Sequence, residues 1–217
     1  CNTTQVTPSS VYNMFAGKSL GSKYRADGYT PKKPVMIIPG LCSSCLKVTE
    51  SPYEPWIGKR IWLSMSSIGF EKMWSPFGSG RGKKKQPDPT DGCEAEEEAK
   101  RRWLAHMCLA ADGISDPEGI KLRAVKGLKG CKYLDPGALT DVLSYVMGPL
   151  AEMLEDLGYE DGLNLDAAPY DWRLPPYRLE ERDSYFTELQ QKIEKMYKEN
   201  DNNKVVIIAH SLGNRVT

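Results

Sequence analysis

The sequence predicts an α/β protein built around a parallel β-sheet. Short apolar runs of strand length, such as "PVMII" and "VVIIA", alternate along the chain with segments whose apolar residues recur at helical spacing. The runs show no alternation of apolar and polar residues, as expected of strands that are covered on both faces. At 217 residues the chain is long enough for one sizeable core.

The first strand follows a polar segment. Residues 1–33 lack a clear period, so we expect an N-terminal arm on the surface. The segment "KPVMIIPG" at 33–40 is a short apolar run that ends in Pro-Gly, which predicts a buried strand entering a tight loop. The main domain is therefore expected to begin at residue 34.

Residues 46–74 combine four large aromatic side chains with polar residues, at Trp56, Trp62, Phe70 and Trp74. Within them, residues 58–74 resemble a short helix, and we expect 46–74 together with 103–118 to form a cap or lid. Packing in the core or cap is the expected role for most of these aromatics, and contact with a membrane is the alternative.

The composition changes sharply at residues 75–102. Gly, Pro and Ser dominate first, and blocks of Lys and Glu follow. Such a segment buries little apolar surface, so we expect a flexible insertion. Lys83, Lys84 and Lys85 are expected to lie in a solvated loop, with a binding role as the alternative.

Further strands and helices follow in alternation. The segment 119–127 is a predicted strand between glycines, and 162–172 is a predicted strand with the loop after it. From Leu139 the apolar residues follow one helical face that ends at Gly158, and Pro149 within it predicts a kink or a restart. A second amphipathic helix is predicted from five apolar residues, namely Phe186, Leu189, Ile193, Met196 and Tyr197.

Composition and charge exclude some functions. Lys plus Arg and Asp plus Glu each number 29, so net charge gives no reason to expect nucleic acid as a partner. No apolar run approaches the roughly 20 residues of a membrane span. The chain opens on Cys1, from which we expect processing or trimming, and Asn2-Thr3-Thr4 is a glycosylation sequon that favours the secretory pathway.

The six cysteines, at 1, 42, 45, 93, 108 and 131, fit either disulfides in a secreted protein or free thiols in the cytosol. Cys42 and Cys45 form a C-x-x-C pair, but no second pair or nearby histidine completes a zinc site. We therefore expect neither a metal ion nor an organic cofactor.

The segment "KVVIIAHSLG" predicts a nucleophile elbow, the strand–turn–helix that exposes a catalytic serine. The usual pattern is G-x-S-x-G, because small residues are needed two positions on either side of the serine. Here Ala209 takes the first position and Gly213 the second. Ser211 is the candidate nucleophile, the N–H of Leu212 one oxyanion donor, and the N–H of Leu41, in the loop after "VMII", the second.

A serine needs a base to take its proton, and in this fold the order along the chain is Ser, Asp or Glu, His. None of residues 212–217 is Asp, Glu or His, His106 stands in the wrong order, and His210 cannot fold back to its neighbour's hydroxyl. We therefore expect that residues 34–217 are the N-terminal half of the domain. A second polypeptide, a C-terminal fragment of the same precursor, is expected to supply Asp and His and to cover the exposed sheet edge.

Two segments carry a family resemblance. "APYDWR" at 168–173 lies about forty residues before "AHSLG", and together with "PVMIIPG" they resemble the lecithin:cholesterol acyltransferase family, which includes phospholipases A and phospholipid:sterol and phospholipid:diacylglycerol acyltransferases. The likeness runs from about Pro34 to Thr217, with a gap at the insertion. It implies an α/β-hydrolase fold with a lid, and transfer of a phospholipid acyl group to water or an alcohol at a membrane or lipoprotein surface.

The resemblance also bears on single residues. It carries Ser211 over as nucleophile and Leu41 and Leu212 as oxyanion donors. The family has a glycine where this chain has Ser43, which is a departure in the oxyanion loop. The family closes its lid with a disulfide, and Cys45 and Cys108 flank the comparable region. Asp171 and Arg173 are expected to form a salt bridge that supports the elbow from beneath.

The lead hypothesis is thus a serine phospholipase A or phospholipid acyltransferase in the secreted, vacuolar or lysosomal compartment, peripheral to the membrane. One alternative is a non-catalytic lipid-binding or interaction module that keeps the same fold. Another is a serine esterase that acts on a small substrate.

Overall fold

The computed structural model describes residues 19–62, 89–134 and 146–217, with side chains from residue 97 onward in the second range. Three strands in it form a parallel sheet in the order β5–β1–β6, namely β1 (Val35–Ile38), β5 (Leu165–Ala167) and β6 (Val206–Ala209). The predicted α/β class with a parallel sheet is confirmed. The carboxyl ends of the three strands lie at one edge, because Ile37 pairs with Ala167 and Ile38 with Ala209.

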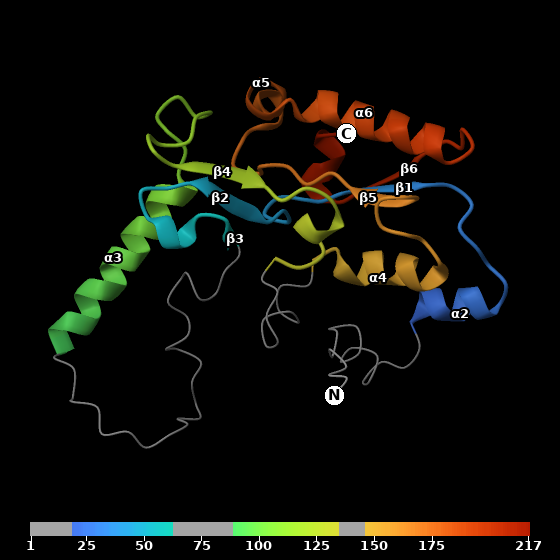
Figure 1. The fold of residues 1–217 in the computed structure, drawn as a ribbon, viewed down its shortest axis with the longest axis horizontal. Helices are drawn as coiled ribbons and strands as arrows, with labels where there is room; N and C mark the ends of the chain where they lie inside the picture. Colours follow the sequence, from blue (N-terminus) through green and yellow to red (C-terminus); the bar gives the residue numbers. More distant parts are fainter. Residues whose placement is uncertain (1–18, 63–88, 135–145) are drawn as a thin grey trace, which may run out of the picture.

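Helices lie on both faces of this sheet (Figure 1), with α5 (Leu179–Asp183) and α6 (Tyr185–Glu199) on one face and α4 (Gly148–Leu157) on the other. Met36 and Ile38 of β1 join the apolar cluster with α6, whereas Val35 and Ile37 join the cluster with α4. This double burial explains why β1 is a continuous apolar run. Strand β6 is less covered than the sequence predicted, since Val206 is 41% exposed.

The predicted helix around Pro149 restarts at that residue. Helix α4 begins at Gly148 with Pro149 in its first turn, where the missing N–H costs no hydrogen bond. It ends at Gly158, which takes the left-handed φ of 115° that glycine adopts without strain. Residues 139–145 of the predicted helix lie outside the described residues.

The N-terminal arm contains a helix that the sequence reasoning missed, α2 (Leu20–Ala26). The Ser19 hydroxyl caps it by accepting a hydrogen bond from the N–H of Ser22 at 3.1 Å. A Cβ at Gly21 would lie 1.9 Å from the carbonyl oxygen of Met153, so glycine permits α2 to pack closely on α4. Residues 1–18, with the sequon at Asn2, lie outside the described residues.

A second, antiparallel sheet has the order β3–β2–β4 and consists of β2 (Leu46–Glu50), β3 (Arg60–Trp62) and β4 (Lys121–Ala124). The strand predicted at 119–127 is confirmed, but it belongs to this sheet and not to the parallel one. The helix predicted at 58–74 is wrong for residues 60–62, which pair with β2. The rest of that prediction lies outside the described residues.

The long helix α3 (Pro89–Met107) occupies much of the predicted flexible insertion, so that prediction is wrong for residues 89–102. Its charged residues form salt bridges between positions i and i+4. Arg101 pairs with Glu97 at 3.0 Å, and Arg102 pairs with Glu98 at 3.3 Å. Trp103 and Met107 at its end pack on the antiparallel sheet. Residues 75–88, which include the three consecutive lysines, lie outside the described residues.

Four short 3₁₀ turns complete the described elements, at Glu54–Trp56 (η1), Leu128–Gly130 (η3), Pro176–Arg178 (η4) and Ser211–Arg215 (η5). Among the helices in the described ranges, none combines the length and the apolar character that a membrane span requires.

Candidate active site

Ser211 stands in a sharp turn where β6 ends. The N–H of His210 still bonds to the carbonyl of Ile38 at 3.0 Å, and the 3₁₀ turn η5 begins at the next residue. Ser211 has a φ of 52°, a left-handed conformation that is strained for a residue with a Cβ. A strained, solvent-exposed serine between a strand and a helical turn is the geometry of a nucleophile elbow. The turn after Ser211 is 3₁₀, where the sequence led us to expect a helix.

Gly213 lies against the first strand of the sheet. A Cβ at this position would lie 2.6 Å from the carbonyl oxygen of Ile38 and 2.8 Å from that of Pro39. Both atoms are backbone, so neither yields easily. This contact explains why the elbow pattern ends in glycine. The half-buried Ala209 takes the other small position.

Gly213→Ala is expected to separate the elbow from β1. The added methyl group has no space, so we expect a loss of about 1–3 kcal/mol in the free energy of unfolding and slower reaction of Ser211 with a fluorophosphonate probe. Denaturant unfolding and gel-based labelling measure the two effects. Ala209→Gly is the matched control, because it restores the usual pattern and should leave labelling nearly unchanged. Equal behaviour of the two variants would contradict the elbow geometry.

The loop after β1 lies directly beside the elbow. A Cβ at Gly40 would lie 2.9 Å from Nδ1 of His210 and 3.0 Å from Cβ of Ser211. Within the described residues, the N–H groups of Leu41 and Leu212 make no backbone hydrogen bond. Two unengaged donors therefore flank the serine, as an oxyanion site requires. Their roles stay predictions, but the fold brings Ser211, Leu212 and the Leu41 loop together.

This loop keeps its turn without the glycine that the family resemblance led us to expect at Ser43. Cys42 instead takes the left-handed conformation, with a φ of 59°. The N–H of Ser43 bonds to the carbonyl of Gly40 at 3.2 Å, and the Ser43 hydroxyl donates to the carbonyl of Leu41 at 3.1 Å. The chain thus forms the turn one residue earlier than the family pattern places its glycine.

Asp171 and Arg173, in the loop after β5, form the predicted salt bridge at 2.6 Å. Two further residues join them, since Arg173 pairs with Asp116 at 2.7 Å and Arg182 with Asp171 at 2.6 Å. All four side chains are at most 8% exposed. Their described contacts lead to the segment 106–116 and to α5, not to the underside of the elbow as the sequence reasoning expected.

Asp116 and Arg182 escaped the sequence analysis because nothing in their surroundings distinguishes them from solvated charges. Burial alone would raise the pKa of Asp171, but hydrogen bonds and charges from Arg173 and Arg182 outweigh it and lower that pKa. Asp171 is therefore ionised and already neutralised at neutral pH. It acts as a structural anion and not as a proton acceptor.

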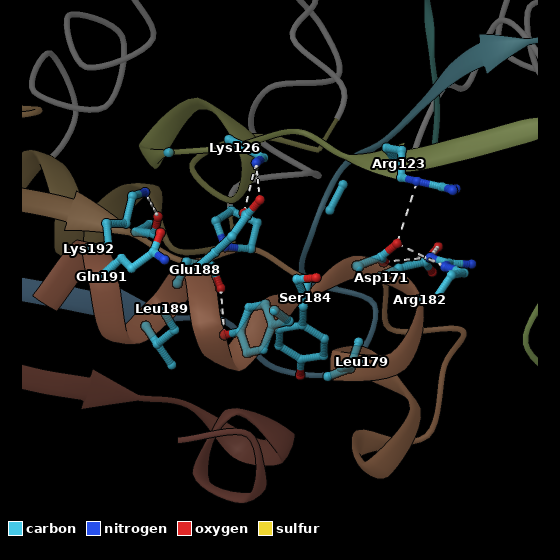
Figure 2. Close-up of a pocket in the computed structure, with 18 of the residues that line it drawn as sticks. Arg123, Lys126, Asp171, Leu179, Arg182, Ser184, Glu188, Leu189, Gln191 and Lys192 are labelled. Atoms are coloured by element: carbon cyan, nitrogen blue, oxygen red, sulfur yellow. Dashed lines mark hydrogen bonds and ion pairs between the residues drawn. The ribbon is translucent and has the colours of Figure 1, made fainter.

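A cavity of about 710 Å³ lies between the end of β5, β4 and helices α5 and α6. Arg123, Asp171 and Arg182 gather at one end of it, and Lys126, Glu188 and Lys192 at the other (Figure 2). Its lining includes neither Ser211 nor Leu41, so this charged cavity is separate from the elbow. Among the described residues, no group of three or more His, Cys, Asp or Glu side chains could hold a metal ion.

Neither histidine hydrogen-bonds to the Ser211 hydroxyl in the described part of the chain. His106 is 2% exposed, and its ring bonds to the Ser51 hydroxyl at 2.9 Å and to the Arg102 carbonyl at 2.7 Å, which fastens α3 to β2. The exposed ring of His210 lies beside Gly40. Within the described ranges, no side chain hydrogen-bonds to the Ser211 hydroxyl.

The disulfide that the resemblance suggested between Cys45 and Cys108 is absent. Cys108 is an exposed thiol, whereas Cys45 is buried and donates to the carbonyl of Tyr133 at 3.0 Å.

Comparison with known proteins identifies a family and several curated relatives. Residues 95–217 match the family described as lecithin:cholesterol acyltransferase. The chain is 32% identical over 200 residues to the Arabidopsis thaliana protein named "Putative phospholipid:diacylglycerol acyltransferase 2", which covers 91% of this chain and 25% of that protein. It is 32% identical over 197 residues to "Phospholipid:diacylglycerol acyltransferase" of Schizosaccharomyces pombe. That match covers 88% of this chain and 25% of the relative.

A third relative is the "Lysosomal phospholipase A and acyltransferase" of Bos taurus, 40% identical over 119 residues, or 52% of this chain and 28% of that protein. The chain thus spans about a quarter of the length of the curated relatives that it matches.

Proposed function

The chain belongs to the lecithin:cholesterol acyltransferase family, and on this premise we propose that it carries the nucleophile of a phospholipase A or phospholipid acyltransferase. The substrate is a fatty acyl ester of a glycerophospholipid, and the acyl group passes to water or to an alcohol such as a sterol or diacylglycerol. The names of the relatives support an acyl-transfer enzyme that acts on phospholipids. We further propose Ser211 as the nucleophile.

One observation carries the assignment of Ser211. It is an exposed serine held at a φ of 52°, in a turn that touches Gly40 of the neighbouring loop. Strain of about 1–3 kcal/mol at one residue persists only where the surroundings impose it, and it occurs preferentially at active sites. Ser184 also has a left-handed φ, of 50°, so the feature that distinguishes Ser211 is its place at the end of β6 and against Gly40.

The proposed reaction has two acyl transfers. Ser211 Oγ attacks the ester carbonyl carbon while a base takes its proton, and the negative charge on the carbonyl oxygen is stabilised by the N–H groups of Leu41 and Leu212. Collapse expels the lysophospholipid alkoxide, which takes the proton back from the base, and leaves an acyl-serine. Water or an alcohol then gives its proton to the base and attacks the acyl carbon, and the base returns this proton to Ser211 Oγ as the acyl–serine bond breaks.

We assign the base and its orienting acid to residues outside 1–217, in a segment of the same precursor. His106 is occupied between Ser51 and Arg102, and His210 lies beside Gly40. The name of the bovine relative supports a lumenal location in the secretory pathway. Secretion, glycosylation at Asn2, proteolytic processing and peripheral binding to a lipid surface are parts of the same proposal.

The test uses vesicles of phosphatidylcholine labelled in an acyl chain, with cholesterol in one set and diacylglycerol in another. The 217-residue chain alone is expected to show only residual turnover, because loss of the base costs nearly as much as loss of the serine. The chain combined with the segment that bears Asp and His should release labelled fatty acid, sterol ester or triacylglycerol. The labelled product distinguishes hydrolase from transferase.

Two outcomes contradict the proposal. Robust hydrolysis by the chain alone would require another base within residues 1–217. Vesicle binding without any labelled product in the combined protein would favour the non-catalytic lipid-binding module.

A further inference from the structure

The loop from Gly40 to Ser44 is held by two indole N–H groups. Nε1 of Trp62 donates to the carbonyl of Cys42 at 2.8 Å, and Nε1 of Trp172 donates to the carbonyl of Ser44 at 3.2 Å. The backbone N–H of Tyr170 adds a bond to the Ser44 hydroxyl at 3.2 Å. The loop that carries the Leu41 N–H is therefore fixed from its carbonyl side.

The two indoles also contact each other. Their ring centroids lie 4.8 Å apart at an interplanar angle of 61°, an edge-to-face arrangement that stabilises aromatic pairs. Trp62 comes from β3 of the antiparallel sheet, whereas Trp172 follows β5 of the parallel sheet. The pair thus joins the two sheets at the loop between β1 and β2, and a displacement of one indole moves the other.

The loop needs such support because its geometry is strained. Cys42 has a φ of 59°, which costs a residue with a Cβ about 1–3 kcal/mol unless its surroundings hold it. On one side of Leu41, Gly40 touches the elbow, and on the other, Cys42 is held through its carbonyl by Trp62. Without the Trp62 bond, relaxation of Cys42 would turn the adjoining peptide planes and reorient the Leu41 N–H.

We propose that Trp62 and Trp172 are positioning residues that hold the oxyanion loop so that the Leu41 N–H faces the ester oxygen at Ser211. This inference rests on the proposed function. Trp62 has the larger effect, because its bond is shorter and it holds the strained residue. The proposal assigns neither indole a contact with the substrate.

The test compares Trp62→Phe and Trp172→Phe with Trp103→Phe in the complete enzyme. Phenylalanine keeps an aromatic ring and removes the donor. Trp103 is the matched control, since its Nε1 donates to the carbonyl of Ile61 at 3.5 Å in the same sheet, and its indole makes no hydrogen bond to residues 40–44 among those described. We expect kcat to fall roughly 10- to 100-fold in Trp62→Phe, with KM nearly unchanged. In Trp172→Phe the fall in kcat should be smaller, and in Trp103→Phe kcat should stay close to that of the parent enzyme.

A second measurement reports on the loop without the reaction. The Cys42 thiol is partly buried, and this burial raises its pKa. A loosened loop should therefore increase its rate of alkylation by iodoacetamide, followed by peptide mass spectrometry, roughly fivefold in Trp62→Phe. Trp103→Phe should leave this rate unchanged.

The two measurements separate the two proposals. An unchanged alkylation rate, or a loss of kcat equal to that of Trp103→Phe, overturns the positioning role even if Ser211 is the nucleophile. A parent enzyme that a fluorophosphonate does not label at Ser211 overturns the proposed function. In that case the rate of Cys42 alkylation still decides whether the tryptophan pair holds the loop.

Discussion

Ser211→Ala is expected to abolish turnover and labelling by a fluorophosphonate in the complete enzyme. Removal of a serine nucleophile lowers kcat by about 10⁵–10⁶-fold, because no neighbouring group replaces the attacking oxygen. Alanine keeps the Cβ and with it the strained backbone, so the free energy of unfolding should change little. Ser115→Ala, in an exposed loop away from the elbow, is the matched control and should keep full labelling.

Ser211→Gly tests the strain independently of the reaction. Glycine adopts a φ of 52° without cost, so this variant should be more stable than Ser211→Ala by about 1 kcal/mol. Both variants should be inactive. Labelling that survives in Ser211→Ala would refute the nucleophile assignment, and equal stability of the two variants would refute the strained turn.

Asp171→Ala is expected to be the most destabilising single change in the described core. Asp171 is fully buried and bonds to Arg173 and Arg182, so its removal leaves these guanidinium groups with only Asp116 and Asp183 as partners and the buried cluster short of one negative charge. Breaking a buried pair in this way costs about 3–5 kcal/mol. Glu97→Ala is the matched control, because the exposed pair that it breaks with Arg101 should contribute nearly nothing. Denaturant unfolding at neutral pH measures both.

The same interaction predicts a pH dependence. The pKa of Asp171 is lowered in the folded protein, so its contribution is complete above the unfolded pKa of about 3.9. That contribution is lost as the pH falls through the folded pKa. The difference in unfolding free energy between the parent and Asp171→Asn should therefore be largest at neutral pH and shrink below about pH 4. A difference that stays constant down to pH 3 would contradict the ionised cluster.

Several parts of the fold follow from local sequence alone. The apolar run of β1, the amphipathic pattern of α6 and the Pro149 and Gly158 boundaries of α4 each depend on interactions within a few residues. The elbow is similar, since its strand, its serine and its small flanking residues are contiguous. These elements were predictable because the pattern that signals them is also the pattern that stabilises them.

The charged helix α3 shows where a local pattern was misjudged. Its blocks of Lys and Glu suggested disorder by composition, but the spacing of Glu97 with Arg101 and Glu98 with Arg102 suits i,i+4 pairs. This i,i+4 spacing is visible in the sequence, but the prediction relied on the overall composition of the segment. Strands β2 and β3 differ, because their short mixed sequences become strands only by pairing with each other and with β4.

The sequence by itself determined the parallel sheet, the serine at its edge and the family. Tertiary structure alone decided how the Gly40–Ser44 loop and the Asp171 cluster are held. Asp116 stands 57 positions before Arg173, and Trp62 stands 20 positions after Cys42, yet each pair is in hydrogen-bond contact. Neither contact has a sequence signal, because a buried ion pair or an indole–carbonyl bond depends on where separate elements pack. Local patterns specify the elements, and only the packing of the two sheets brings these distant partners to the Gly40–Ser44 loop and the Asp171 cluster.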